Sequence, residues 1–218
     1  MAPARLVVGV AEHNGWAILV CVSAPDGSPE VIDRRRVELI EPGLPNQPYE
    51  HETVGMSSTE AERLVQEVRE SAAHCAEREL SRLKSTHNLV SIALRTAPLP
   101  QFPASVAEVH ASWYLRARTD AMLYHQALCA AAASLGINVA MFKRGEERPR
   151  AAEALATTAA ALDEFLTGLR QTLGPPWQQD HQAATARAIA ALREHTTFTT
   201  QVPRHEPRTK PRRGSQTS

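Results

Sequence analysis

Three features of the sequence predict an α/β protein with a mixed sheet of about five strands. The first 40 residues hold three extended apolar segments separated by tight turns, which is typical of an antiparallel meander. Amphipathic helical segments then alternate with short apolar segments, which is typical of strands joined by helices. A chain of 218 residues has the length of one sizeable domain. We therefore expect a single domain over residues 1–198 and a disordered basic tail over 199–218.

The meander is indicated by its turns as much as by its strands. Its extended segments are residues 5–11, 15–23 and 30–40. Asn14-Gly15 joins the first two, and both residues tolerate the positive φ angles of a two-residue hairpin. Asp26-Gly27 provides the second turn. The third segment, VIDRRRVELIE, has a polar middle between apolar ends, which indicates an edge strand with one exposed face.

The remainder of the domain is predicted to alternate between helices and strands. A loop rich in proline and glycine over residues 41–55 precedes the first helix, whose N-cap is Ser57, Ser58 or Thr59. Glu60 or Glu62 completes a capping-box pattern. The later elements are a helix to Lys84, a buried strand over 88–97, a second long helix over 104–135 closed by Gly136, a short strand over 137–144, a helical region over 151–173 and a last helix over 177–195.

Composition excludes several classes of protein. The 24 basic residues balance the 24 acidic ones, so any attraction to nucleic acid must be local. Cys21, Cys75 and Cys129 are far apart and form no CxxC pair, which favours reduced thiols over disulfides or a zinc site. No secretory or membrane-spanning segment is found, and Walker, GxSxG, HExxH and GxGxxG motifs are absent. We expect a cytoplasmic protein without a membrane partner; the oligomeric state is not indicated.

The order of three strands followed by alternating helices and strands resembles the ribonuclease H-like fold over residues 5–195. That superfamily includes ribonuclease H, Holliday-junction resolvases, transposases and, more distantly, actin-like ATPases. In its nucleases, the first strand, the first helix or fourth strand, and the last helix each supply a carboxylate. The resemblance implies that such acids hold two divalent metals, about 4 Å apart, for phosphodiester cleavage. Mg²⁺ or Mn²⁺ would be the cofactor of an enzymatic member.

The sequence departs from this acidic pattern at two strands. Where resolvases begin with GID, this chain has GVA, which places Ala11 at the position of the metal-binding aspartate. Glu12 follows and is expected to face the other side of the strand. The fourth strand, VSIALRTA, ends without a carboxylate.

Two helices offer further acids, each with an alternative role. Glu60 and Glu62 lie where ribonuclease H supplies a glutamate, but helix capping explains them as well. Asp180 is the candidate on the last helix, where it also complements the helix dipole. Its segment, GPPWxxD, resembles a stretch of bacterial proteins that carries no assigned activity.

Asp120 is predicted to lie at the centre of the apolar face of the second long helix. A buried carboxylate requires a partner, so two interpretations stay open. In the first, Asp120 pairs with Arg116 or accepts a hydrogen bond from a loop amide. In the second, it belongs to a functional site. His110 and His125 flank the same face and are expected to be hydrogen-bonded structural residues.

Two functional hypotheses follow from the resemblance. The preferred one is a binding or assembly module without an intact two-metal site, contacting nucleic acid through basic residues. Those residues are Arg34, Arg35 and Arg36 on the third strand and Arg208, Lys210, Arg212 and Arg213 in the tail. The alternative is a metal-dependent phosphodiester hydrolase with a rearranged acidic set. Its candidate residues, catalytic or metal-binding, are Glu12, Asp120 and Asp180, with Glu60 or Glu62 as a further ligand.

Overall fold

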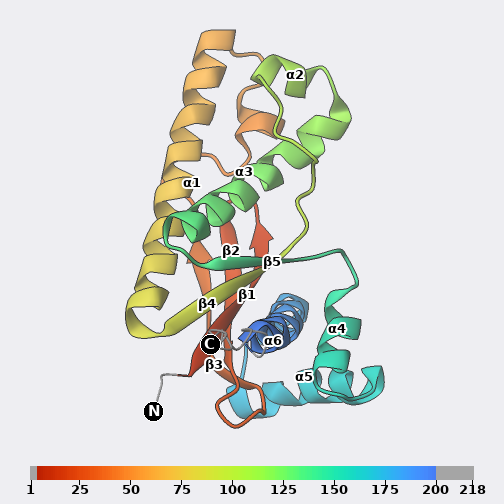
Figure 1. The fold of residues 1–218 in the computed structure, drawn as a ribbon. Helices are drawn as coiled ribbons and strands as arrows, with labels where there is room; N and C mark the ends of the chain where they lie inside the picture. Colours follow the sequence, from red (N-terminus) through yellow and green to blue (C-terminus); the bar gives the residue numbers. More distant parts are fainter. Residues whose placement is uncertain (1–3, 200–218) are drawn as a thin grey trace, which may run out of the picture.

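A computed structural model describes residues 4–199, and it contains the predicted mixed sheet between two layers of helices (Figure 1). The five strands are β1 (Arg5–His13), β2 (Trp16–Ser23), β3 (Glu30–Glu38), β4 (Asn88–Arg95) and β5 (Asn138–Phe142). They lie in the order β3-β2-β1-β4-β5. The fold class predicted from the sequence is therefore confirmed.

Strand direction decides which residues meet at the edge of the sheet. β1 and β2 pair antiparallel, as do β2 and β3, and these three form the meander. β4 pairs parallel with β1, and β5 pairs parallel with β4. The carboxyl ends of β1, β4 and β5 consequently lie at one edge of the sheet, although they are far apart in sequence.

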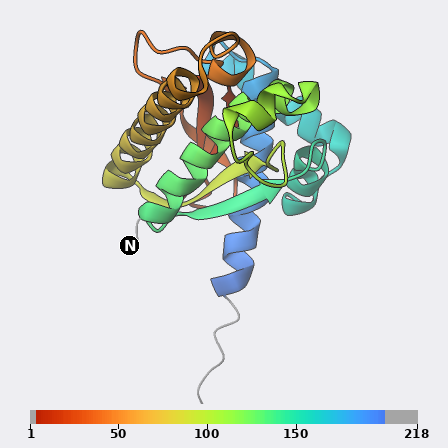
Figure 2. The same cartoon turned by 90° about the horizontal axis from the view of Figure 1, so that it is seen from above.

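Helices cover both faces of this sheet. The helical elements are the π-helical turn η1 (Pro48–Glu52), α1 (Ser58–Thr86), α2 (Val106–His110), α3 (Trp113–Ser134), α4 (Glu147–Ala154), α5 (Ala159–Leu173) and α6 (Gln179–Thr199). α1 and α3 pack together on one face, whereas α6 crosses the other face with α4 and α5 beside it (Figures 1 and 2). None of the described helices is long and apolar enough to span a bilayer.

β1 separates two hydrophobic cores, because successive side chains of a strand point to opposite faces. Val8 and Val10 lie in the core beneath α1 and α3. Val7 and Ala11 lie in the core beneath α6. Gly9 faces α6 at such close range that an added Cβ atom would lie only 1.7 Å from the carbonyl oxygen of Ala184.

Two helices expected to be continuous are each divided. Ser112 interrupts the second long helix, because its side chain accepts a hydrogen bond from the backbone N–H of Leu115 and starts α3. The helical region over 151–173 was expected to be unbroken but is split between α4 and α5, where Ala156 adopts a positive φ of 50°. The expected loop over 41–55 also contains η1.

The C-terminal part of the chain differs from expectation in one respect. α6 continues past the expected end at residue 195 and runs to Thr199. The basic residues assigned to the tail, Arg208, Lys210, Arg212 and Arg213, lie outside the described residues, so their role stays a prediction.

Candidate functional site: an arginine-lined cleft

A cleft of about 320 Å³ opens at the edge where the parallel strands end. Its lining comes from the end of β1, the end of β4, the first half of α3 and the segment after β5. The lining residues are Glu12, His13, Arg95, Thr96, Pro98, Arg118, Ala121 and Arg144. Ligands of open α/β sheets bind beyond the carboxyl ends of the strands, so this is the expected place for a site.

Three arginines give the cleft its charge. Arg95 is the last residue of β4, Arg144 follows β5, and Arg118 lies in the second turn of α3. Arg118 donates a hydrogen bond to the carbonyl of Tyr114 at 3.3 Å. Among the described side chains, no carboxylate forms an ion pair with any of these arginines. Their positive charges are therefore available to an anionic ligand.

The acid of the cleft, Glu12, is already paired on the α3 side of the sheet. Its Oε1 lies 3.4 Å from Nδ1 of His125, and Sγ of Cys129 lies 3.6 Å from the other ring nitrogen. Burial lowers the pKa of His125, but the hydrogen bonds to Cys129 and Glu12 outweigh it and raise the pKa to about 9. The imidazole is then protonated at neutral pH, so it offsets the Glu12 carboxylate.

A further buried cation, Arg187 of α6, lies beside the end of β1. Its guanidinium donates to the carbonyl oxygen of Val10, and burial lowers its pKa. Glu12 is close enough to act on it electrostatically. Within residues 4–193, Oε2 of Glu12 and Nε of Arg187 are buried without hydrogen-bond partners. The polar groups around the end of β1 thus include more fixed positive than negative charge.

Asp180, the candidate acid of the last helix, is turned toward β1. Its Oδ2 lies 3.0 Å from Nε2 of His13. The His13 ring in turn stacks on Trp16 of the hairpin, with centroids 3.9 Å apart and nearly parallel planes. This chain of contacts joins the first turn of α6 to the end of β1, which is a structural role for Asp180.

The structure shows whether Asp120 pairs with Arg116 or accepts a hydrogen bond from a loop amide. Its two carboxylate oxygens accept hydrogen bonds from the backbone N–H groups of Tyr49 and Glu50, each at 3.0 Å. No ion pair joins it to Arg116 among the described residues. Burial raises the pKa of Asp120 to about 7, against the lowering effect of the two N–H donors. Asp120 holds η1 against α3, so its partner is the loop amide.

The candidate acids of α1 accept hydrogen bonds from backbone N–H groups at the starts of helices. Glu60 and Ser57 form the predicted capping box, with hydrogen bonds in both directions. Oε1 of Glu62 accepts from the backbone N–H of Val106 at 2.8 Å, which caps α2. His110 lies 3.0 Å from the Thr53 hydroxyl, as expected of a hydrogen-bonded structural histidine.

These placements allow a test of the metal site that the fold resemblance implies. Glu12, Asp120, Asp180 and Glu60 have four separate sets of partners. Across the part of the chain that the structure describes, no group of three or more His, Cys, Asp or Glu residues could hold a metal ion. Each of these acids is engaged by its own partners in this structure, so a two-metal site built from them stays a prediction.

The arginines of β3 are engaged within the chain. Arg34 donates to the carbonyl oxygens of Leu173 at 2.6 Å and Gly174 at 2.9 Å, where α5 ends. Arg35 pairs with Asp33, in the same strand. Arg36 pairs with Glu38 at 2.9 Å and lies over the Trp16 ring at 4.2 Å. Their role as phosphate contacts stays a prediction, and it would require them to leave these partners.

Comparison with known proteins supports the fold and goes no further. No protein-family profile and no curated protein matches the sequence. The chain is similar to the structure of T. thermophilus RuvC in complex with Holliday junction substrate, with a TM-score of 0.51, 14% identity, and coverage of 89% of this chain and 97% of that chain. A second Thermus thermophilus RuvC structure has a TM-score of 0.48, 16% identity and the same coverage. Together with the sheet order, the first match establishes a ribonuclease H-like fold.

Sequence reasoning missed the arginines of this cleft. Arg95 and Arg144 carried a usable signal, because Arg95 ends the parallel strand β4 and Arg144 lies two residues beyond the end of β5. Arg118 and Arg187 carried none, since each lies among ordinary helical residues and reaches its neighbours only through tertiary packing.

Proposed function

We propose that this chain is a ribonuclease H-like binding module that contacts the phosphates of nucleic acid through Arg95, Arg118 and Arg144. The observation that carries the proposal is the position of these arginines. They line one cleft beyond the carboxyl ends of the parallel strands, and no described carboxylate forms an ion pair with them. The preferred hypothesis from the sequence is thereby kept, with the contact surface moved from β3 to the cleft.

Arginine suits this role for two physical reasons. Its planar guanidinium can donate two parallel hydrogen bonds to a phosphate, and its charge persists at any physiological pH. Binding also releases counterions from the phosphate backbone, which makes the affinity strongly dependent on salt. The paired Glu12 and His125 leave this balance positive.

The structural comparison supports nucleic acid as the class of ligand. RuvC, which shares this fold, is described in complex with a Holliday junction substrate. The tail residues Arg208, Lys210, Arg212 and Arg213 would add affinity that does not depend on nucleotide sequence.

The alternative function is a metal-dependent phosphodiester hydrolase. It would require Glu12, Asp120, Asp180 and Glu60 to leave their present partners and converge on Mg²⁺ or Mn²⁺. Because Asp120 is 2% exposed and binds two backbone amides, this rearrangement would have to release η1.

Fluorescence anisotropy with labelled oligonucleotides tests the proposal. Replacing Arg118 or Arg144 by Ala should weaken binding by about tenfold each, because each substitution removes a charged hydrogen bond worth about 1.5 kcal/mol. Arg63→Ala is the matched control, since Arg63 is an exposed arginine on α1 whose ion pair with Glu67 spans 4.0 Å. Equal affinity of all variants would contradict the proposal.

A nuclease assay on branched and hybrid substrates with Mg²⁺ or Mn²⁺ separates the two functions. We expect no cleavage above that of the Glu12→Gln variant. Cleavage that this substitution abolishes would establish the hydrolase instead.

A further inference from the structure

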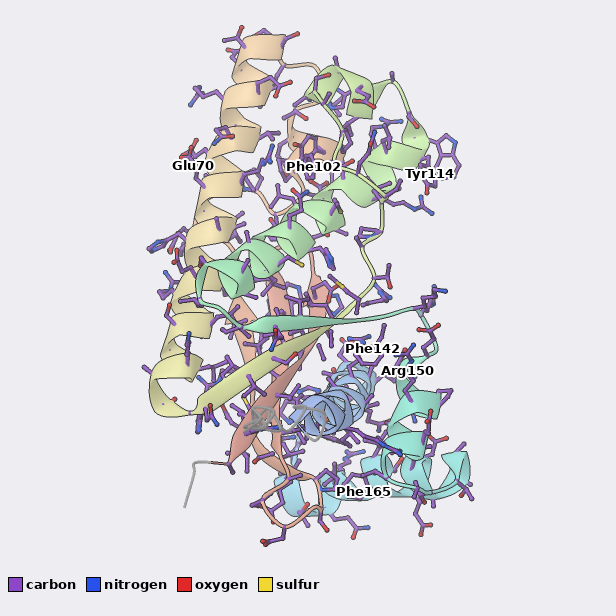
Figure 3. All side chains as sticks on the ribbon, in the orientation of Figure 1. Glu70, Phe102, Tyr114, Phe142, Arg150 and Phe165 are labelled. Atoms are coloured by element: carbon purple, nitrogen blue, oxygen red, sulfur yellow. The ribbon has the colours of Figure 1, made fainter. Side chains whose placement is uncertain are left out.

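Two aromatic side chains project from the first turn of α3, next to the arginine cleft. Trp113 is 73% exposed and Tyr114 is 44% exposed. Figure 3 shows Tyr114 at the outer end of α3, turned away from the helix. The two rings meet edge to face, with centroids 6.3 Å apart and planes at 86°. Large exposed aromatic side chains mark contact surfaces, because leaving them in water forgoes the free energy of burial.

Arg118 connects this aromatic pair to the cleft. Its guanidinium lies over the Tyr114 ring at 4.1 Å, and the same side chain lines the cleft. Tyr114 and Arg118 are four residues apart on α3, which is about 6 Å along the helix axis. Arg118 therefore links the aromatic pair to the cleft.

The charge around the aromatic pair favours an anionic polymer. The first turn of α3 contains no acidic residue, and Arg118 follows in the next turn. Trp, Tyr and Arg also dominate contacts between proteins, so a protein partner is the competing occupant. The arginines of the adjacent cleft, which have no carboxylate partner among the described side chains, are complementary to phosphates, and this favours nucleic acid over a protein partner.

Aromatic stacking also selects the form of nucleic acid. In a duplex, each base is covered on both faces by its neighbours, so a protein ring cannot reach a base face without unstacking it. Unpaired bases expose these faces, and stacking on an aromatic side chain strengthens binding by about five- to 100-fold per base. A surface that combines arginines with exposed rings is the arrangement expected for single strands.

We propose that Trp113 and Tyr114 form a stacking platform for unpaired bases, so that the ligand of the cleft is single-stranded nucleic acid. The inference rests on the proposed function, because the cleft arginines supply the phosphate contacts. The platform adds selectivity for unpaired nucleotides, which charge alone does not provide.

The test compares a labelled DNA single strand of twelve nucleotides with the duplex of the same sequence. The wild-type protein should bind the single strand at least about tenfold more tightly, and Trp113→Ala or Tyr114→Ala should each remove about five- to 100-fold of that affinity while changing duplex binding little. Trp113→Phe should retain most of the affinity, since it keeps a ring. Ile32→Ala is the matched control, because Ile32 is 47% exposed on the opposite edge strand β3.

Two further readouts separate this inference from the proposed function. Trp emission should be quenched by the single strand in the wild type and much less in Trp113→Phe. Inorganic polyphosphate, which has no bases, should bind wild type and Trp113→Ala equally but bind Arg118→Ala weakly. Polyphosphate binding that is equally strong in Arg118→Ala and the wild type would overturn the proposed function.

Two results would contradict the stacking of bases on Trp113 and Tyr114. Equal affinity for single strand and duplex would overturn it, even if the arginine variants bind less tightly. Unchanged affinity of Trp113→Ala and Tyr114→Ala would also overturn it, and a protein contact would then account for the exposed rings.

Discussion

The chain contains two sets of three arginines that differ in the partners of their side chains. Arg34, Arg35 and Arg36 are consecutive in sequence, and each has a partner within the chain. The cleft arginines come from three separate segments and have no carboxylate partner among the described side chains. The contiguous set resembles a phosphate-binding motif, but its arginines are engaged within the chain, and their role as phosphate contacts stays a prediction. The dispersed set has no motif, yet topology brings it to one edge of the sheet.

The difference shows that the parallel direction of three strands brings the arginines of the cleft together. Three parallel strands end at the same edge, so residues at or beyond their ends become neighbours. Consecutive residues on a strand instead alternate between faces and reach separate partners.

Disrupting the fold should eliminate the cleft, and this is the largest effect we expect. In Gly9→Ala, the new Cβ atom would collide with the backbone carbonyl of Ala184, which cannot move aside without shifting α6. We expect a loss of about 3 kcal/mol or more in the free energy of unfolding, measured by urea denaturation. Gly168→Ala is the control, because a Cβ atom there has nothing within 4 Å and α5 gains a better helix former. Equal stability of the two variants would refute the close packing of β1 on α6.

Removing a strand arginine should affect stability and leave ligand binding unchanged. Arg34→Ala loses the hydrogen bonds to the carbonyl oxygens at the end of α5 and its contact with the Trp177 ring at 5.7 Å. We expect a loss of about 2 kcal/mol in unfolding free energy. Arg36→Ala, which removes an exposed surface pair, should cost less than about 1 kcal/mol. A large loss of oligonucleotide affinity in a stable Arg34→Ala protein would return β3 to the binding surface.

Asp120, like the strand arginines, has its hydrogen-bond partners within the chain. Its pKa rises from an ordinary 3.8 to about 7 on burial, so folding favours the protonated form. Its contribution to stability is therefore greatest below pH ~4, falls as the pH rises from about 4 to about 7, and is constant above that.

Asp120→Asn removes this titration. The stability advantage of the wild type over the variant should be smaller at pH 8 than at pH 5, as measured by urea unfolding at both values. An advantage that grows with pH would show that the two amide donors outweigh burial, and that the carboxylate is ionised in the native state.

The sequence was a good guide to the fold and a poor one to the cleft, for physical reasons. Asn14-Gly15 and Asp26-Gly27 specify the meander locally, and apolar periodicity identifies strands and helices. The break at Ser112 was missed because the apolar pattern continues through it and only the cap starts a new helix. Arg95, Arg118 and Arg144 meet only through tertiary structure, so no local pattern could have grouped them.

The salt dependence of oligonucleotide binding shows whether the cleft arginines contact phosphate. For a single strand, each neutralised phosphate contributes about 0.7 to the slope of log affinity against log salt concentration. The triple variant Arg95→Ala, Arg118→Ala and Arg144→Ala should reduce the magnitude of this slope by about 2. The double variant Arg35→Ala and Arg36→Ala should keep the wild-type slope. An unchanged slope in the cleft variant, or a reduced slope in the strand variant alone, would contradict the claim that the cleft arginines contact phosphate.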